Sequence, residues 1–278
     1  MARKAAVETG RHSSFEVVRR WLWIWTGLSL AAAAALLGWH NLDAMLVRDS
    51  RFTLAAPEDA GEESSSLRIS GVQFASRDAV QSVFARDFGR SVYLIPIEER
   101  RRALLAVNWV RDARVSRIWP DKLDVLITER EPVAFLHLAS DGSEAAPAQT
   151  LVDAEGVILR QQSASKFSLP VLTGIRTAQG LDERRVRVRR MLRLMEAVGP
   201  HAGRLSEVDV GDPDNLRVTI QLQNRAIVLI LGNKRFRERL ENFEINYPEI
   251  RRRAPDETIF DLRLDDRIIA IPGGQDGG

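Results

Sequence analysis

The sequence predicts an α+β protein with a single N-terminal transmembrane helix, a small domain of order β-α-α-β-β, and a β-rich domain with two helices. Three patterns lead to this prediction. An uncharged apolar run extends from Trp21 to Trp39. Between residues 67 and 131, helical spacing of apolar residues alternates with strand spacing. Beyond residue 132, short runs of strand length dominate, and only two segments have helical periodicity.

Composition sets limits on the class of protein. The chain has 278 residues, of which 45% are hydrophobic and 28% charged, which suits one or two globular domains. The formal net charge is only +2, and the arginines are interleaved with acidic residues, so no nucleic-acid partner is expected. The absence of cysteine excludes disulfides, thiolate metal sites and a cysteine nucleophile.

The run from Trp21 to Trp39 has the length of one membrane crossing. As a helix it rises roughly 28 Å at about 1.5 Å per residue, against a hydrocarbon core of about 30 Å. Tryptophans lie at both ends, where the amphipathic indole suits the interface. Basic residues outnumber acidic ones in residues 1–20, whereas the charges just after the run roughly cancel. This bias predicts a cytoplasmic tail, residues 1–20, and an exported C-terminal part.

A cleaved signal peptide is the alternative, because the segment Ala31 to Ala35 offers small-residue cleavage sites behind a basic start. The apolar stretch continues to Trp39 and reaches spanning length, which favours a permanent tether. A buried globular helix would instead be expected to carry a polar face.

Residues 40–66 predict a juxtamembrane linker, because this segment contains Pro57, Gly61 and a serine-rich acidic stretch with little apolar periodicity. The small domain follows over residues 67–131. A strand from Leu67 ends in a turn at Gly71, and Ser76 then caps a helix that stops at Gly89.

The second half of the small domain predicts another helix and a strand pair. Pro96 is suited to the first turn of this helix. In the first strand Ala113, Val115 and Trp119 are expected on one face, and the second strand alternates with Leu123, Val125 and Ile127 facing inward. Glu129, Arg130 and Glu131 are interpreted as a charged hinge before the next domain.

The β-rich domain is predicted over residues 132–272, followed by a disordered tail, residues 273–278. One helix is expected from about Asp182 to Val198 and another from near Lys234. The apolar face of the first helix is predicted to consist of Val188, Met191, Leu192, Met195 and Val198. The strands are expected at VAFLHL, QTLVDAEGVIL, LPVL, LSEVDV, NLRVTIQL, AIVLILG, TIFDLRL and RIIAI.

No pattern of catalytic or metal-binding residues is found, so no catalytic residue, metal site or cofactor is predicted. The four histidines do not form a metal-ligand pair, and His137 is interpreted as a strand-face residue because no serine or cysteine nucleophile motif accompanies it. Gly232, Asn233 and Lys234 lack the spacing of a phosphate loop. The adjacent pair Asp265 and Asp266 is interpreted as part of a turn.

Residues 108–136 read NWVRDARVSRIWPDKLDVLITEREPVAFL, which closely resembles a gap-free signature of the FtsQ/DivIB family of bacterial cell-division proteins. Further similarity lies in LVDAEGVIL, LPVLTG and FDLRLDDRIIA, so the resemblance covers nearly all of the exported part. Three residues depart from the family pattern. Asn108 stands at the position of a usual Pro, where it is interpreted as a tolerated change near a cap; Leu264 replaces a common Tyr, and Asp266 a common Gly.

The resemblance implies a POTRA domain followed by an FtsQ-type β domain. It also implies a non-enzymatic scaffold of the divisome that binds FtsB-like and FtsL-like bitopic partners and other divisome membrane proteins. Such a scaffold helps control septal peptidoglycan synthesis. The expected location is the cell inner membrane at the division septum, in contact with membrane lipid through one span.

Partner binding is expected by addition of a strand to an open edge, formed either by Thr258 to Leu264 or by Arg267 to Ile271. Arg263 and Arg267 would select an acidic partner segment, unless they are only solubilising edge charges. The apolar contact would come from the face that is not inward, and its candidates are Phe260, Leu262 and Leu264.

A second candidate surface lies in the small domain, where basic side chains surround a tryptophan. Its residues are Arg114, Arg117, Trp119 and Lys122. They are expected either to dock another membrane protein or to serve the fold, with the stem of Arg117 packed across the sheet and Trp119 closing the domain.

Two other protein classes share parts of this organisation. A POTRA-bearing component of a transport or assembly system would be expected to repeat the small domain or to contain a long barrel region. A membrane-anchored cell-wall enzyme would need a nucleophile or metal constellation. The sequence favours neither.

Overall fold

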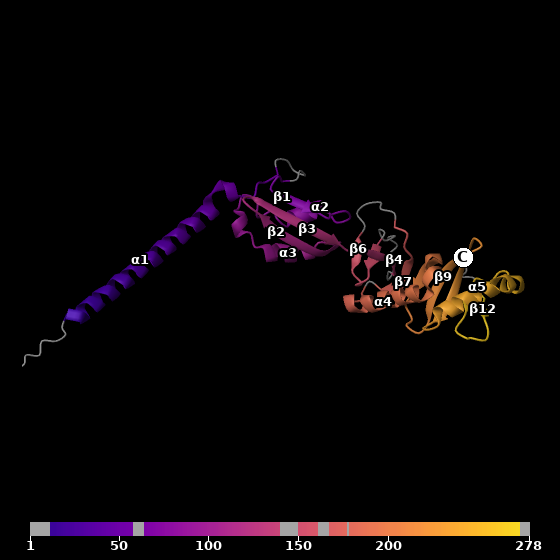
Figure 1. The fold of residues 1–278 in the computed structure, drawn as a ribbon. Coiled ribbons are helices and arrows are strands. Elements are labelled where there is room, and N and C mark those ends of the chain that lie inside the picture. Colours follow the sequence, from indigo (N-terminus) through magenta and orange to yellow (C-terminus); the bar gives the residue numbers. More distant parts are fainter. Residues whose placement is uncertain (1–11, 58–63, 140–149, 161–166, 177, 273–278) are drawn as a thin grey trace, which may run out of the picture. The chain divides into compact units, whose positions relative to one another are not determined.

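The computed structural model describes residues 12–57, 64–139, 150–160, 167–176 and 178–272. Internal contacts divide the chain into two compact units (Figure 1). Unit 1 comprises Met1–Ser70, Gln81–Arg101 and Arg114–Leu126, and unit 2 comprises Gly71–Val80, Arg102–Ala113 and Ile127–Gly278. The predicted C-terminal tail and most of the predicted cytoplasmic tail lie outside the described residues.

The N-terminal helix α1 (His12–Arg48) is longer than the predicted span. Its part from Arg19 to Trp39 is long and apolar enough to cross a membrane, and no residue of that part is buried inside the protein. It is the one such helix in the part of the chain that the structure describes. The tether predicted from hydropathy is therefore a continuous helix that extends well past Trp39.

The predicted linker differs from the structure beyond α1. A 3-10 helix η1 (Ser50–Phe52) follows at once, and Leu54 is completely buried. The backbone of Leu54 donates to Arg90 O at 2.9 Å and accepts from the N–H of Gly89 at 2.8 Å. One apolar side chain and two backbone bonds thus fix this part of the segment to the domain, which its turn-rich composition did not indicate.

The small domain has the predicted order β-α-α-β-β. Its sheet has the strand order β1-β3-β2, and β1 runs parallel to β3 with Leu67 opposite Leu123. The elements are β1 (Leu67–Ser70), α2 (Arg77–Ser82), the 3-10 helix η2 (Val92–Leu94), α3 (Ile97–Leu105), β2 (Val110–Ile118) and β3 (Lys122–Glu129).

Two local predictions in this domain were wrong. Ser76 does cap the first helix, because its Oγ accepts from the N–H of Ala79 at 3.1 Å, but α2 ends at Ser82 and turns continue to Gly89. Trp119 does not share the buried face of Ala113 and Val115: it follows the end of β2, is 51% exposed, and packs edge-on against Phe52.

The β-rich domain contains one sheet of nine strands in the order β12-β11-β10-β9-β8-β7-β4-β5-β6. All the predicted strands are present, and the parallel pairs β4·β7, β7·β8 and β10·β11 are connected through longer segments. The strands are β4 (Pro132–Ala139), β5 (Thr150–Asp153), β6 (Ile158–Arg160), β7 (Val171–Arg176), β8 (Leu205–Asp209), β9 (Leu216–Leu222), β10 (Arg225–Gly232), β11 (Ile259–Asp261) and β12 (Ile269–Ile271).

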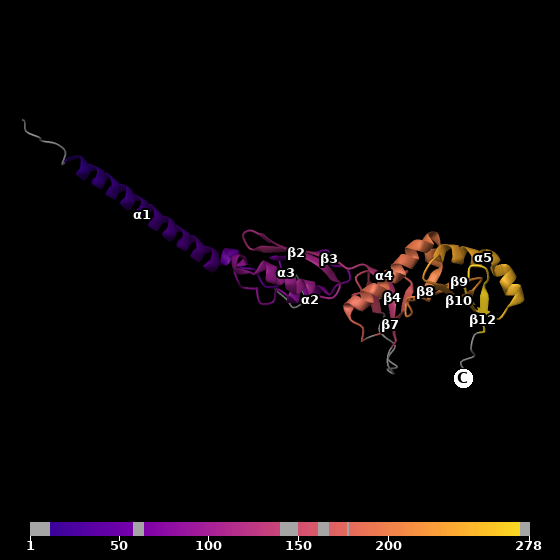
Figure 2. The same ribbon diagram turned by 90° about the horizontal axis from the view of Figure 1, so that it is seen from below.

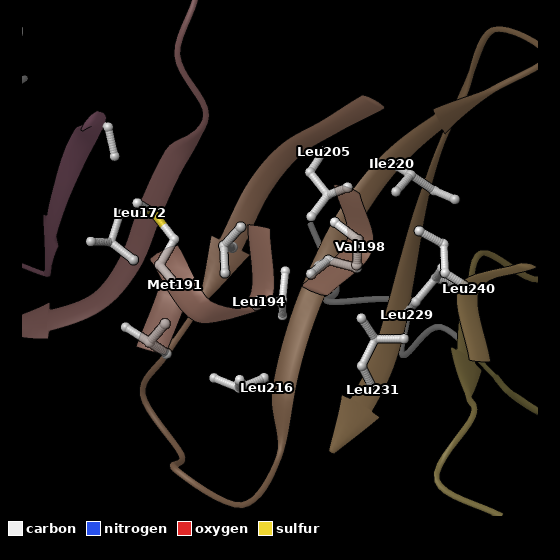
Figure 3. Packing of buried hydrophobic residues seen from close by; sticks show 14 of the residues in the cluster. Leu172, Met191, Leu194, Val198, Leu205, Leu216, Ile220, Leu229, Leu231 and Leu240 are labelled. Atoms are coloured by element: carbon white, nitrogen blue, oxygen red, sulfur yellow. The ribbon is translucent and has the colours of Figure 1, made fainter. Parts of the chain in front are cut away.

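Two helices, α4 (Leu181–Val198) and α5 (Phe236–Arg253), pack on this sheet and complete its core. Figure 3 shows Met191, Leu194 and Val198 of α4 among the leucines of the central strands. Leu194 is fully buried, although the sequence pattern assigned Leu192 and Met195 to that face instead; both are only partly buried. The helix face is therefore rotated slightly from the predicted one.

The three charged residues at the end of β3 were predicted to form a hinge, but two of them are bonded within unit 2. The Glu129 carboxylate accepts from three consecutive backbone N–H groups, those of residues 73–75, at 2.7 to 3.1 Å. Arg130 Nη1 donates to Asp153 Oδ2 at 2.7 Å. The segment 73–75 follows Gly71, whose positive φ of 80° brings its backbone close to Ile127 O. A glycine is required there, since a Cβ would lie 2.1 Å from that oxygen.

Replacing Glu129 by alanine is expected to lower the free energy of unfolding by about 1–2 kcal/mol, because three charge-assisted bonds at a partly exposed site are lost. Denaturant unfolding of the detergent-solubilised chain, followed by tryptophan fluorescence, measures the change. Glu131→Ala, at an exposed position two residues away, is the matched control. Equal stabilities of the two variants would contradict the role assigned to Glu129.

Candidate partner-binding edge

The nine-stranded sheet ends at β12 on one side and at β6 on the other. The outer backbone groups of an edge strand have no ladder partner, so each edge could accept another strand unless something covers it. The two edges of this sheet differ in that respect.

The β6 edge is covered by two side chains that lie just before β2. Asn108 Nδ2 donates to Ile158 O at 3.0 Å, and its Oδ1 accepts from the N–H of Arg160 at 3.1 Å. Trp109 Nε1 donates to Arg160 O at 2.8 Å. The side-chain amide of Asn108 therefore bonds a backbone acceptor and a backbone donor of β6 that a neighbouring strand would otherwise bond. Its interpretation as a cap change was incomplete, because a pattern comparison does not show which strand lies beside it.

The backbone alternation of β11 follows from its bonds to β10. Val228 N–H donates to Thr258 O at 2.8 Å, and Leu262 N–H donates to Ile230 O at 3.0 Å. Backbone groups alternate in direction along a strand, so Phe260, midway between these two residues, also directs its N–H and C=O toward β10.

Ile259 and Asp261 must then direct their backbone groups to the other side, toward β12. Their partners in the antiparallel register are Ile271 and Ile269. Ala270, between these partners, is left with its N–H and C=O pointing away from the sheet. Of the two edges predicted from the sequence, the one in Arg267 to Ile271 is open, whereas Thr258 to Leu264 contains the interior strand β11.

The side chains of the candidate segment divide into a buried and an exposed set. Phe260 and Leu262 belong to the hydrophobic core, so neither can supply the apolar contact for which it was a candidate. Leu264 is 49% exposed and Ile269 is 42% exposed. Leu264 and Ile268 also line a hollow of about 240 Å³ beside α5. The apolar surface at this edge thus includes two isoleucines that the sequence did not single out.

The two arginines predicted for this site are both ion-paired locally. Arg263 Nη2 lies 2.6 Å from Asp261 Oδ2, and Arg267 Nη2 lies 2.7 Å from Asp266 Oδ2. Arg263 also donates to Asn215 Oδ1 at 2.6 Å. The hydrogen bond from Arg263 lowers the pKa of Asp261 from its ordinary value of 3.8, which keeps the carboxylate charged. A partner carboxylate would therefore compete with an existing acid at each arginine.

Arg239 was not predicted, yet its side chain holds the turn between β11 and β12. The buried guanidinium donates to Leu231 O and to Arg263 O, both at 2.7 Å. It also bonds Asp265 Oδ1 at 3.3 Å, and Arg235 pairs with the other oxygen of that carboxylate at 2.7 Å. Asp265, correctly interpreted as a turn residue, is thus bound to α5 by arginines on both of its oxygens. No sequence motif indicated this, because the contacting carbonyls lie far along the chain.

The second predicted surface is not one cluster of free cations. The Arg117 guanidinium donates to Val92 O at 2.7 Å and to Ile95 O at 2.6 Å, so it serves the fold by hydrogen bonding. Arg114 is exposed within β2, while Trp119 and Lys122 are exposed at the turn that joins β2 to β3. Within the described ranges, no group of three or more metal-ligating side chains is present.

Arg239→Met is expected to accelerate amide exchange across residues 259–271 about tenfold, because several buried charge-assisted bonds are lost while the length of the side chain is kept. Hydrogen-exchange mass spectrometry of the full chain measures it, with β6 as an internal reference. Arg237→Met, at an exposed position of the same helix, should leave exchange at residues 259–271 unchanged. Unaltered amide exchange in Arg239→Met would contradict the role of Arg239 in holding the turn between β11 and β12.

Comparison with known proteins gives matches over both domains. A family model for the POTRA domain, FtsQ-type, matches residues 63–130, and one for the C-terminal part of cell division protein FtsQ/DivIB matches residues 145–263.

Relatives match over longer stretches. Cell division protein FtsQ of Koribacter versatilis is 32% identical over 240 residues, which is 84% of this chain and 65% of the relative. FtsQ of Novosphingobium aromaticivorans is 28% identical over 254 residues, or 90% of this chain and 74% of the relative. FtsQ of Bordetella pertussis is 36% identical over 106 residues, or 38% of this chain and 36% of the relative. The chain thus spans less than two thirds of the length of two of these relatives. The two family models match successive parts of the chain, and the relatives named here are all FtsQ proteins. Together these matches show that the chain belongs to the FtsQ/DivIB family of bacterial cell-division proteins.

Proposed function

We propose that this chain is a non-enzymatic scaffold that binds FtsB-like and FtsL-like bitopic partners and helps control septal peptidoglycan synthesis. The observation that carries the proposal is the asymmetry of the large sheet: Asn108 and Trp109 cover the β6 edge, while the β12 edge has no strand beside it among the described residues. Binding by strand addition uses this one open edge.

A partner segment pairs with β12 through the outward N–H and C=O of Ala270. Main-chain hydrogen bonds supply much of the affinity, and side chains on the exposed face supply selectivity. Leu264 and Ile269 offer apolar contact there. Because Leu264 stands where relatives commonly have an aromatic residue, an aliphatic partner side chain suits this chain.

Charge selects the partner segment. Arg263 and Arg267 lie between β11 and β12. An acidic partner side chain can displace Asp266 from the exposed Arg267 at little cost, since a surface ion pair of this kind contributes little. Displacement of Asp261 from Arg263 is harder, because that carboxylate is largely buried and accepts hydrogen bonds from three donors of Arg263, namely its backbone N–H, Nε and Nη2. Arg267 is therefore the more adaptable of the two cations.

The proposed location is the inner membrane at the division septum, with the N-terminus in the cytoplasm and the two domains outside it. Helix α1 supports a single crossing, and the basic residues before it support the orientation. The domain limits that belong to this proposal are residues 67–131 for the POTRA domain and 132–272 for the β domain.

Ala270→Pro is expected to weaken partner capture at least tenfold, because proline removes the outward N–H and leaves the pairs of Ile269 and Ile271 with β11 in place. Capture of an FtsB-like periplasmic segment by the full chain in detergent measures it, together with complementation in cells depleted of the wild-type chain. Ala270→Thr retains the N–H and should bind normally. Undiminished capture by Ala270→Pro would exclude strand addition at β12.

Reversal of both arginine charges, Arg263→Glu with Arg267→Glu, is expected to weaken the same capture by roughly tenfold or more, since favourable pairs become repulsive. The single variant Arg267→Glu tests binding with little effect on folding, because the ion pair between Arg267 and Asp266 lies on the surface. Arg253→Glu, an exposed charge on α5, is the matched control. If the double variant captures its partner as well as the wild type does, the arginines are only solubilising charges.

A further inference from the structure

The end of unit 1 that adjoins α1 carries a cluster of exposed apolar side chains. Four large apolar residues there are between 40% and 51% exposed; they are Tyr93, Leu94, Ile118 and Trp119. Outside the apolar run of α1, unit 1 has just one other exposed residue of this kind among those described, Leu126 on β3. We call these four residues, together with the exposed Lys122, the basal patch.

Contacts within unit 1 place the basal patch beside the end of α1. Trp119 packs edge-on against Phe52, with ring centroids 6.0 Å apart, and Ser91 Oγ donates to Leu46 O at 2.6 Å. The bonds of Arg117 to the carbonyls of Val92 and Ile95 tie β2 to η2. Figure 2 shows the turn between β2 and β3 next to the end of α1. The patch is therefore formed by two segments, η2 and the turn between β2 and β3, which lie beside the end of the tether.

The chain between the apolar run and the domain is too short to hold this end far from a bilayer. Helix α1 continues for nine residues after Trp39, a rise of about 14 Å, and Phe52 follows only four residues later. The headgroup layer occupies roughly 5–8 Å outside the hydrocarbon core, and tilt of the helix shortens the remaining gap. Long side chains at this end of unit 1 are thus within reach of headgroups.

The composition of the basal patch matches a membrane interface. Tryptophan and tyrosine are the residues enriched at headgroup level, where the ring is buried and its polar atom stays hydrated. Lys122 is exposed and makes no ion pair among the described residues, whereas the exposed Arg51 on η1 is ion-paired with Asp49 at 2.7 Å. Such cations are attracted to anionic lipid. Several exposed apolar side chains at one end of a domain are candidates for an interaction site.

We propose that the basal patch docks on anionic lipid headgroups of the same bilayer that α1 crosses. Lipid is favoured over a protein partner because the patch continues directly from the tether and combines interfacial aromatic residues with an unpaired lysine. Docking attaches the part of unit 1 beyond α1 to the bilayer at a second point, and so limits its rotation about the end of α1. For Trp119 and Lys122 the sequence predicted either docking of another membrane protein or a role in the fold, and the proposal gives them lipid as a partner instead.

The test uses the full chain in lipid nanodiscs and takes advantage of its lack of cysteine. A nitroxide is attached to Asp121→Cys in the turn beside the patch, or to Thr128→Cys, six strand residues beyond Lys122 and so about 20 Å away. Spin relaxation by a nickel chelate anchored to lipid headgroups reports proximity to the membrane. The label at 121 should relax several-fold faster than that at 128, and the difference should grow when phosphatidylglycerol is added to phosphatidylcholine.

Variants decide whether the basal patch causes this proximity. Trp119→Ser with Lys122→Glu, and separately Leu94→Glu, should each remove most of the relaxation difference. The second variant spares the packing of Trp119 on Phe52, so a folding defect cannot explain both losses. Leu126→Ser, with similar exposure on the same domain, is the matched control and should retain the difference.

Two results would overturn the proposal. One is equal relaxation at positions 121 and 128 in discs with and without phosphatidylglycerol. The other is protection of the patch that occurs only when a second membrane protein is added, which would assign the surface to a protein partner. Ala270→Pro should not alter the lipid signal, so failure of this inference is distinguishable from failure of strand addition at β12.

Discussion

A sheet of nine strands has two edges, and the proposed function of this chain depends on how each edge is treated. The strand β6 is closed by side chains of residues 108 and 109, which bond the backbone atoms that another strand would use. Among the described residues, no strand lies on the outer side of β12, toward which the backbone groups of Ala270 point. An edge strand is normally a liability that invites aggregation. Because side chains close the β6 edge, the proposed strand addition is confined to β12.

Buried or half-buried charges support that arrangement by fixing connections that lie outside the sheets. Asp87 is fully buried against Arg100, Asp153 accepts from Arg130, and the buried Arg239 bonds the carbonyl of Leu231 on β10 and that of Arg263 between β11 and β12. Charged groups at such depth are retained only where they are paired and hydrogen-bonded. Each of these bonds joins different elements of the fold, so together they fix how the elements are connected.

The two proposed surfaces bind different kinds of partner. The β12 edge lies on unit 2 and offers main-chain hydrogen bonds, which are directional and need a partner with an extended backbone. The basal patch lies on unit 1 and offers aromatic and cationic side chains, which suit a fluid surface without a fixed pattern of donors. A tethered protein with both surfaces can restrict its own orientation at the bilayer and still leave its strand edge accessible.

The amino-acid pattern by itself determined the apolar helix, the order of the small domain and the existence of all the strands. These features follow from local periodicity: alternating Leu123, Val125 and Ile127 define a strand face wherever the strand lies. The family was indicated separately, by the resemblance of residues 108–136 to a contiguous family signature. The predictions from periodicity failed locally, at the helix that ends at Ser82 and at the face of Trp119. There, tertiary contacts outweigh the spacing of apolar residues.

Only the tertiary structure decided which candidate residues are accessible. Phe260 and Leu264 are four residues apart on one segment, yet the first lies in the core and the second faces solvent. Strand order, which depends on pairing between remote segments, made β12 the open edge and β11 an interior strand. The same long-range pairing brought Asn108 to β6 and Arg239 to the last turn. Such contacts have no local sequence signal, because they arise when the chain packs.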